Sequence, residues 1–223
     1  MFRKLFENIS PKNFYYFSSK IIPWAFFVSV IFITYGLYLG LFVAPQDYQQ
    51  GDAFRIIYVH VPSAWLSLFA YSAVFFCSII TLIWKIKVFE ILTIASAKNG
   101  ALFTFLALVT GAIWGKPMWG TYWAWDPRLS SFMILFIFYI GYIALWQAVE
   151  DDDTAADLTA IICIVGSVFA LLSRYAVNLW NQGLHQGATL TVRETSPIDA
   201  SYYYPLLFCI MGFILLFVSL VLL

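Results

Sequence analysis

The chain has 223 residues, of which 62% are apolar and only 11% are charged, and its mean hydropathy is +0.84. Water-soluble domains are about half apolar and about a quarter charged, so this composition excludes a soluble protein and predicts one that lies in a bilayer. The formal net charge is zero, which gives no indication of a nucleic-acid partner.

Six apolar stretches follow one another along the chain, and each is long enough to cross roughly 30 Å of hydrocarbon as a helix. We place them at residues 21–43, 61–84, 91–114, 130–149, 158–177 and 202–223. No internal repeat and no soluble domain is visible. The sequence therefore predicts a single all-α domain over residues 1–223, a polytopic integral membrane protein with six transmembrane helices.

An even number of spans places both termini on the same side of the membrane. With the N-terminus inside, seven lysines and arginines fall in inner segments and five in outer ones, as the positive-inside rule favours. We therefore expect both termini to face the cytoplasm and three outer loops at residues 44–60, 115–129 and 178–201. The acidic run at residues 150–157 is interpreted as a solvated cytoplasmic turn.

The chain has only two histidines, and both fall in these predicted outer loops. His60 lies in "RIIYVHVPSAW" and His185 lies in "NLWNQGLHQGAT". Two imidazoles alone make a poor zinc site, which wants three or four protein ligands, whereas a haem iron takes four ligands from the porphyrin and needs two axial ones. A helix starting just after His60 favours neutral imidazole, the form that binds a metal.

The third apolar stretch leads into an aromatic segment at residues 114–131, "WGKPMWGTYWAWDPRLSS". Its rings are those of Trp114, Trp119, Tyr122, Trp123 and Trp125. An aromatic belt at the membrane interface explains Trp114, which ends a span, better than it explains the tryptophans in the middle of the loop. Trp119, Tyr122 and Trp123 have i, i+3, i+4 spacing, which predicts a shared face on a short interfacial helix.

These rings suit a flat apolar ligand such as a porphyrin, because indoles pack on the face or edge of such a plate. The propionates of a porphyrin need cations. The cations on the same predicted side include Arg55, Lys116, Arg128 and Arg193. A ligand platform is the interpretation that we favour, with a belt of interfacial anchors as the alternative.

Three segments resemble one known family closely: the aromatic segment, "APQDYQQGDAFRIIYVHVP" at residues 44–62, and "WNQGLHQG" at residues 180–187. They are similar to the WWD-motif family of haem-handling membrane proteins in cytochrome c maturation, and the chain resembles the six-span haem exporter C (CcmC) branch nearly end to end. The resemblance implies that His60 and His185 are the axial ligands of a haem b. It also implies that Trp114, Trp119, Trp123, Trp125 and Asp126 belong to the haem platform, with Tyr122 in place of a tryptophan, and that Arg128 pairs with a propionate.

The resemblance further implies a function and a set of partners. Proteins of this family present haem at the periplasmic face of the inner membrane and transfer it to a membrane-anchored haem chaperone (CcmE), which takes it covalently on a histidine. They work with a small membrane subunit (CcmD) and an ABC-type pair (CcmA and CcmB). The membrane is either a bacterial or a mitochondrial inner membrane. The chain is either an enzyme or a protein that assists haem attachment, and the sequence leaves both alternatives in place.

Two other functions remain as alternatives. A membrane cytochrome b that carries electrons also uses paired histidines, but its ligands commonly lie within the spans, and two histidines at one edge serve only one haem. A permease for a small solute wants polar or broken helices near the midplane of the bilayer, and the predicted spans carry little polarity there.

Overall fold

The computed structural model describes residues 11–179 and 199–223, and within these ranges the regular structure is helical. The long helices are α2 (Pro11–Tyr38), α3 (Ile57–Trp84), α4 (Lys87–Trp119), α5 (Pro127–Ala148), α6 (Asp152–Leu179) and α7 (Ala200–Leu222). A short π-helix, η1 (Leu39–Val43), continues α2, and a 3-10 helix, η2 (Asp52–Ile56), leads into α3. In the described part of the chain, six helices are long and apolar enough to cross a membrane, which confirms the predicted fold class.

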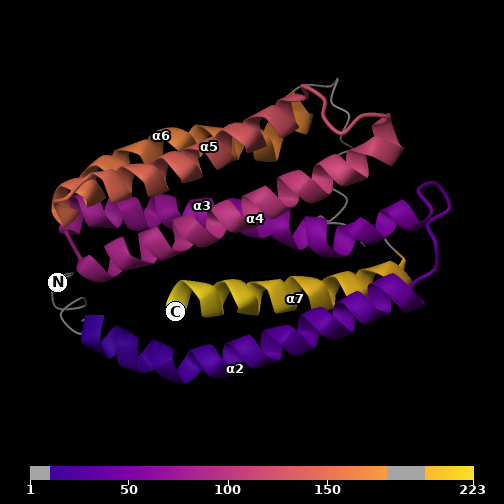
Figure 1. The fold of residues 1–223 in the computed structure, drawn as a ribbon, viewed down its shortest axis with the longest axis horizontal. Coiled ribbons are helices and arrows are strands. Elements are labelled where there is room, and N and C mark those ends of the chain that lie inside the picture. Colours follow the sequence, from indigo (N-terminus) through magenta and orange to yellow (C-terminus); the bar gives the residue numbers. More distant parts are fainter. Residues whose placement is uncertain (1–10, 180–198) are drawn as a thin grey trace.

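The helices form two groups that lie roughly parallel to a common long axis (Figure 1). Helices α3, α4, α5 and α6 pack together, while α2 packs mainly against α7, which in turn contacts α3 and α4. The α2–α7 contact is close because glycines face the partner helix on both sides. A Cβ atom on Gly36 would lie 2.8 Å from the backbone nitrogen of Cys209, and one on Gly212 would lie 2.8 Å from that of Ile33. Small residues at such positions are a usual way for membrane helices to pack.

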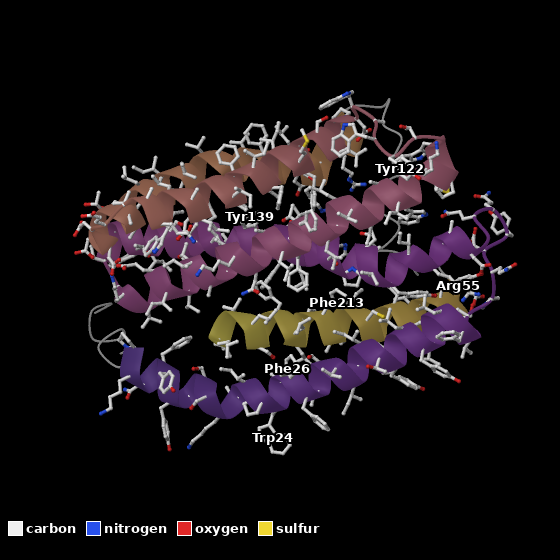
Figure 2. The ribbon with its side chains drawn as sticks, viewed as in Figure 1. Trp24, Phe26, Arg55, Tyr122, Tyr139 and Phe213 are labelled. Carbon is white, nitrogen blue, oxygen red and sulfur yellow. The ribbon has the colours of Figure 1, made fainter. Side chains whose placement is uncertain are left out.

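Large tyrosines fill the centre of the four-helix group. Tyr71, Tyr139 and Tyr142 are almost fully buried, and the Tyr139 hydroxyl donates a 2.8 Å hydrogen bond to the carbonyl oxygen of Ser67 on α3. Figure 2 shows Tyr139 in the interior of this group, whereas Trp24 and Phe26 project from α2. Trp24 is 71% exposed, so this side of α2 is expected to face lipid.

The two ends of the bundle differ in chemistry. One end, called the loop end below, holds residues 44–56 and residues 120–126, at the right of Figure 1. The other, the terminal end, holds the start of α2, the end of α7 and the short connections at residues 85–86 and 149–151. The start of α2 and the end of α7 therefore lie at the same end of the bundle, as expected for an even number of spans.

Ion pairs tie the helices together at the terminal end. Lys85 pairs with Asp157 of α6. Lys87 lies 2.7 Å from the Glu90 carboxylate and within 4 Å of Asp152 and Asp153. The acidic run at residues 150–157 is solvated, with Asp152 and Asp153 72% and 85% exposed, but it is not only a turn, because α6 begins inside it and its carboxylates face Lys85 and Lys87.

The described long helices all begin earlier than predicted, α2 by ten residues and α6 by six, and three boundary differences in α3 and α4 shorten the adjoining loops. Helix α3 begins at Ile57 rather than at residue 61, because Ile57 and Tyr58 are buried against Leu206 and Cys209 of α7. Helix α4 begins at Lys87 rather than at residue 91 and runs through Pro117 to Trp119 rather than ending at residue 114. Most of the predicted loop at residues 178–201 lies outside the described residues.

Candidate functional site

His60 lies in the first turn of α3, which corrects its predicted place in a loop. It is the fourth residue of the helix and is partly buried. Its Nδ1 atom lies 3.0 Å from the Oγ1 atom of Thr110 on α4. The imidazole meets the Trp114 ring edge-on, with centroids 5.6 Å apart, and a Cβ atom on Gly111 would lie 3.0 Å from the imidazole Cε1 atom. One face of α4 thus holds the ring from three sides.

Trp114 connects this histidine to the first loop. Its indole Nε1 donates a 2.9 Å hydrogen bond to the Gln50 side-chain oxygen, and its ring packs against the buried cluster that includes Ile57 and Tyr58. Trp114 therefore lies at the loop end of α4, between His60 and residues 44–51. An interfacial anchor would not require these specific contacts.

The remaining aromatic residues follow a sharp turn at the end of α4. Gly120 adopts a left-handed conformation, with φ of 77°, and its N–H caps the helix on the carbonyl oxygen of Lys116. The short helix predicted over residues 119–123 is wrong, because α4 ends at Trp119 and the chain then runs without regular structure to Asp126. Trp119 and Tyr122 consequently share no helical face.

The four rings beyond Trp114 differ in exposure. Trp119 and Trp123 are partly buried, whereas Tyr122 and Trp125 are 61% and 78% exposed. Trp123 and Trp125 meet edge-on with centroids 5.8 Å apart. The Nε1 atom of Trp123 is buried and has no hydrogen-bond acceptor in the part of the chain that the structure describes. A buried donor of this kind calls for an acceptor, which a bound ligand can supply.

Asp126 ends this segment and begins α5. Its side chain is buried, and its Oδ1 atom accepts hydrogen bonds from the backbone N–H groups of Arg128 and Leu129, at 2.8 and 3.3 Å. Pro127 occupies the first helical position. These are the features of a helix N-cap. Asp126 therefore braces the end of the segment, and Arg128 lies in the first turn of α5.

The Arg55 side chain donates hydrogen bonds both to backbone carbonyl oxygens and to a carboxylate. Its Nη1 atom donates hydrogen bonds of 2.8 and 2.9 Å to the carbonyl oxygens of Gly40 and Leu41, and its Nε atom bonds Asp52 at 2.8 Å. The guanidinium thus donates to carbonyls of η1, at a helix end where backbone carbonyls need donor partners from outside the helix. Figure 2 shows Arg55 at the same end of the bundle as Tyr122.

The second predicted ligand, His185, and the cation Arg193 lie outside the described residues. Among the residues that are described, no group of three or more His, Cys, Asp or Glu side chains is able to hold a bare metal ion. The structure therefore places His60 against Trp114 and puts the rest of the aromatic segment at the same end of the bundle, and His185 is not described.

The sequence did not predict that Thr110 and Gly111 contact His60, or that Gln50 contacts Trp114. Thr110 and Trp114 are four residues apart and so share a face of α4, which was a readable signal. Gln50 carried no signal, because its bond to Trp114 spans 64 residues of sequence.

Chemically, this end of the molecule offers an imidazole of fixed orientation, several large flat rings and at least two cations. Such a set suits a planar, largely apolar, metal-bearing ligand with acidic substituents.

Known proteins of one family are similar to this chain over nearly its whole length. A family model described as Heme exporter protein C (CcmC) matches residues 4–223. A Paracoccus denitrificans protein named Heme exporter protein C is 50% identical over 218 residues, which cover 98% of this chain and 90% of the relative. Proteins of the same name from Rhodobacter capsulatus and Escherichia coli are 48% and 42% identical, over 98% and 100% of this chain and 90% and 89% of their own length. The chain belongs to the Heme exporter protein C family.

Proposed function

We propose that this chain binds haem at the periplasmic face of a bacterial inner membrane, or at the equivalent face in mitochondria, and transfers it to a membrane-anchored haem chaperone (CcmE) for the assembly of c-type cytochromes. Family membership supports the haem cargo, since the relatives are named as haem exporters. The structural observation that carries the proposal is the imidazole of His60, which α4 holds at the loop end beside the aromatic segment.

The iron of a haem b is proposed to take His60 and His185 as its axial ligands. The chain contains no other histidine. Two axial imidazoles complete the coordination that a porphyrin leaves open. Because His60 lies within the first turn of α3 rather than in a mobile connection, its side chain starts from a rigid element, which limits how far the cargo shifts before transfer.

The aromatic segment is proposed to support the porphyrin plate. Trp119 and Trp123 are the partly buried rings, and Tyr122 and Trp125 are the exposed ones that a second protein can reach. Trp114 is proposed to act through its contact with His60. The buried Nε1 atom of Trp123 is a donor suited to an oxygen of the cargo.

Arg128 and Arg55 are the proposed partners of the propionates. Of the two, Arg128 is the stronger candidate, because three of the five N–H donors of Arg55 already bond Asp52 and two carbonyls of η1. We further propose that the small subunit (CcmD) and the ABC-type pair (CcmA and CcmB) assemble with this chain. The loaded chaperone then leaves with their help.

A double substitution tests whether the aromatic segment delivers haem or only anchors the protein. Trp119→Ala with Trp123→Ala is expected to leave the protein inserted and abundant but to lower the covalent haem on the chaperone per inserted molecule. Each lost aromatic contact weakens retention by about 0.5–1.5 kcal/mol beyond the loss of buried area. The measurement is chaperone-bound haem normalised to inserted variant.

The matched control replaces two exposed tryptophans away from the aromatic segment, Trp24→Ala with Trp84→Ala. These are expected to change abundance at most, and to leave delivery per molecule as it is in the unmodified chain. Normal delivery by the Trp119 and Trp123 double variant would mean that these rings are only interfacial anchors.

A further inference from the structure

We propose that Thr110 is a positioning residue for His60, which fixes the neutral imidazole in the tautomer that carries its proton on Nδ1 and its lone pair on Nε2. This inference rests on the proposed function for its purpose, since the lone pair is what an iron ligand needs. The hydrogen-bond geometry that supports it does not depend on any cargo.

The location of the hydroxyl proton of Thr110 decides the tautomer. The Oγ1 atom lies 2.7 Å from the carbonyl oxygen of Leu106, one turn earlier in α4, and 3.0 Å from Nδ1 of His60. Two oxygens 2.7 Å apart need a proton between them, and only the threonine hydroxyl has one to give. That distance is typical of O–H···O, and 3.0 Å is typical of N–H···O.

The hydroxyl oxygen is therefore a donor to Leu106 and an acceptor from the histidine. The opposite assignment, with the hydroxyl donating to Nδ1, would leave two lone-pair oxygens facing each other at 2.7 Å in a partly buried place. In a neutral imidazole only one nitrogen carries the proton. With the proton on Nδ1, the lone pair is on Nε2.

While Thr110 sets the tautomer, its neighbours on α4 fix the plane of the ring. Trp114 meets the imidazole at an interplanar angle of 74°. Gly111 lets the Cε1 edge come close to the backbone of α4, where a Cβ atom would lie 3.0 Å away. A histidine that ligates a metal usually donates its other N–H to a protein oxygen, which orients the ring and makes it a better ligand. Thr110 supplies that oxygen here.

The first test reads the tautomer without haem. The full-length chain with His185→Ala contains one imidazole, so its ¹⁵N-histidine NMR signals belong to His60 alone. At alkaline pH, where the ring is neutral, we expect a protonated Nδ1 and an unprotonated Nε2. Thr110→Ser keeps the hydroxyl and is expected to keep this pattern, whereas Thr110→Val removes the acceptor and is expected to shift the proton to Nε2. A protonated Nε2 in the parent, or an unchanged pattern in Thr110→Val, would overturn the proposal.

The second test reads the consequence for haem binding in the chain with both histidines. Loss of such a supporting hydrogen bond typically weakens metal binding by about 10- to 100-fold. We expect Thr110→Val to weaken haem binding by that factor and to change the low-spin spectrum, and Thr110→Ser to restore both. Ser72→Ala is the control, because Ser72 makes the same kind of bond to its own helix, at 2.9 Å to Leu68, but is exposed and far from His60 in sequence. Unchanged affinity and spectrum in Thr110→Val would contradict the positioning role.

The two tests separate this inference from the proposed function. A bis-histidine spectrum that survives His60→Ala would show that His60 is not a ligand, and so would contradict the proposed function. The NMR result would still decide whether Thr110 sets the tautomer.

Discussion

At the scale of single residues, the hydrogen bonds of Arg55 allow a direct prediction of how much stability is lost when they are removed. Its side chain is only 20% exposed and donates to two carbonyl oxygens of η1 and to Asp52. Hydrogen bonds from a charged group contribute about 1.5–3 kcal/mol. Arg55→Ala is therefore expected to lower the free energy of unfolding by about this amount, measured by denaturant unfolding in detergent.

The controls for Arg55 separate its carbonyl contacts from its charge. Arg55→Lys is expected to recover only part of the stability, because an ammonium group cannot reproduce the fork of the guanidinium. Arg174→Ala removes an exposed arginine that contacts the Tyr175 ring and is expected to change little. Equal effects of Arg55→Ala and Arg174→Ala would show that the bonds from Arg55 to η1 and Asp52 contribute nothing to stability.

The site could be predicted from the sequence only in part at this scale. The two histidines and the aromatic segment stood out because their residue types are rare and concentrated. The contacts of His60 with Thr110 and of Trp114 with Gln50 could not be predicted. The first pair is separated by 50 positions in the sequence and the second by 64. Nothing local in the chain specifies such pairs before the helices pack.

At the scale of elements, the turn that ends α4 sets where the aromatic segment begins. Gly120 has φ of 77°, a conformation that costs a residue with a Cβ atom about 1–2 kcal/mol. Gly120→Ala is expected to destabilise the fold by that amount and to weaken haem binding, since the new side chain strains the turn between Trp119 and Tyr122. Thermal unfolding and haem titration measure the two effects.

Gly141 in α5 is the matched control for this turn. It lies in a helix, and a Cβ atom there would meet no heavy atom within 4 Å. Gly141→Ala is expected to be neutral or to stabilise the helix by up to about 1 kcal/mol, with no effect on haem. If Gly120→Ala behaved like Gly141→Ala, the turn would not matter to the site.

The helix boundaries show why an element can be predicted while its ends cannot. Hydropathy located all six spans, but it placed the start of α3 four residues late and the end of α4 five residues early. The start of α3 depends on the burial of Ile57 and Tyr58 against α7, a tertiary contact. The end of α4 depends on Gly120, which caps the helix beyond a proline that usually marks a boundary.

At the scale of the whole molecule, the pairing of α2 with α7 was not predictable from the sequence. In a soluble helix the apolar stripe marks the packed face, but here the lipid-facing side is equally apolar. Trp24 is exposed, whereas Gly36 of α2 and Gly212 of α7 each face the other helix. Small residues mark the packed face of a membrane helix, but several helices carry them, so they did not identify α2 and α7 as partners.

The orientation in the membrane is a prediction for the whole molecule. We expect the loop end to face the periplasm and the terminal end to face the cytoplasm. In a variant with its three cysteines replaced, Trp125→Cys should react with a membrane-impermeant thiol reagent in intact spheroplasts, and Asp153→Cys should react only after lysis. Both side chains are well exposed, at 78% and 85%. The reverse pattern would invert the topology.

The central claim is that a single haem is held at the loop end by His60 and His185. The optical spectrum of the purified chain loaded with haem, compared among the parent, His60→Ala and His185→Ala, tests it most directly. We predict a low-spin, bis-histidine spectrum for the parent and the loss of that spectrum, together with lower haem content, in each single variant. A low-spin spectrum that stays unchanged in both variants would contradict the claim.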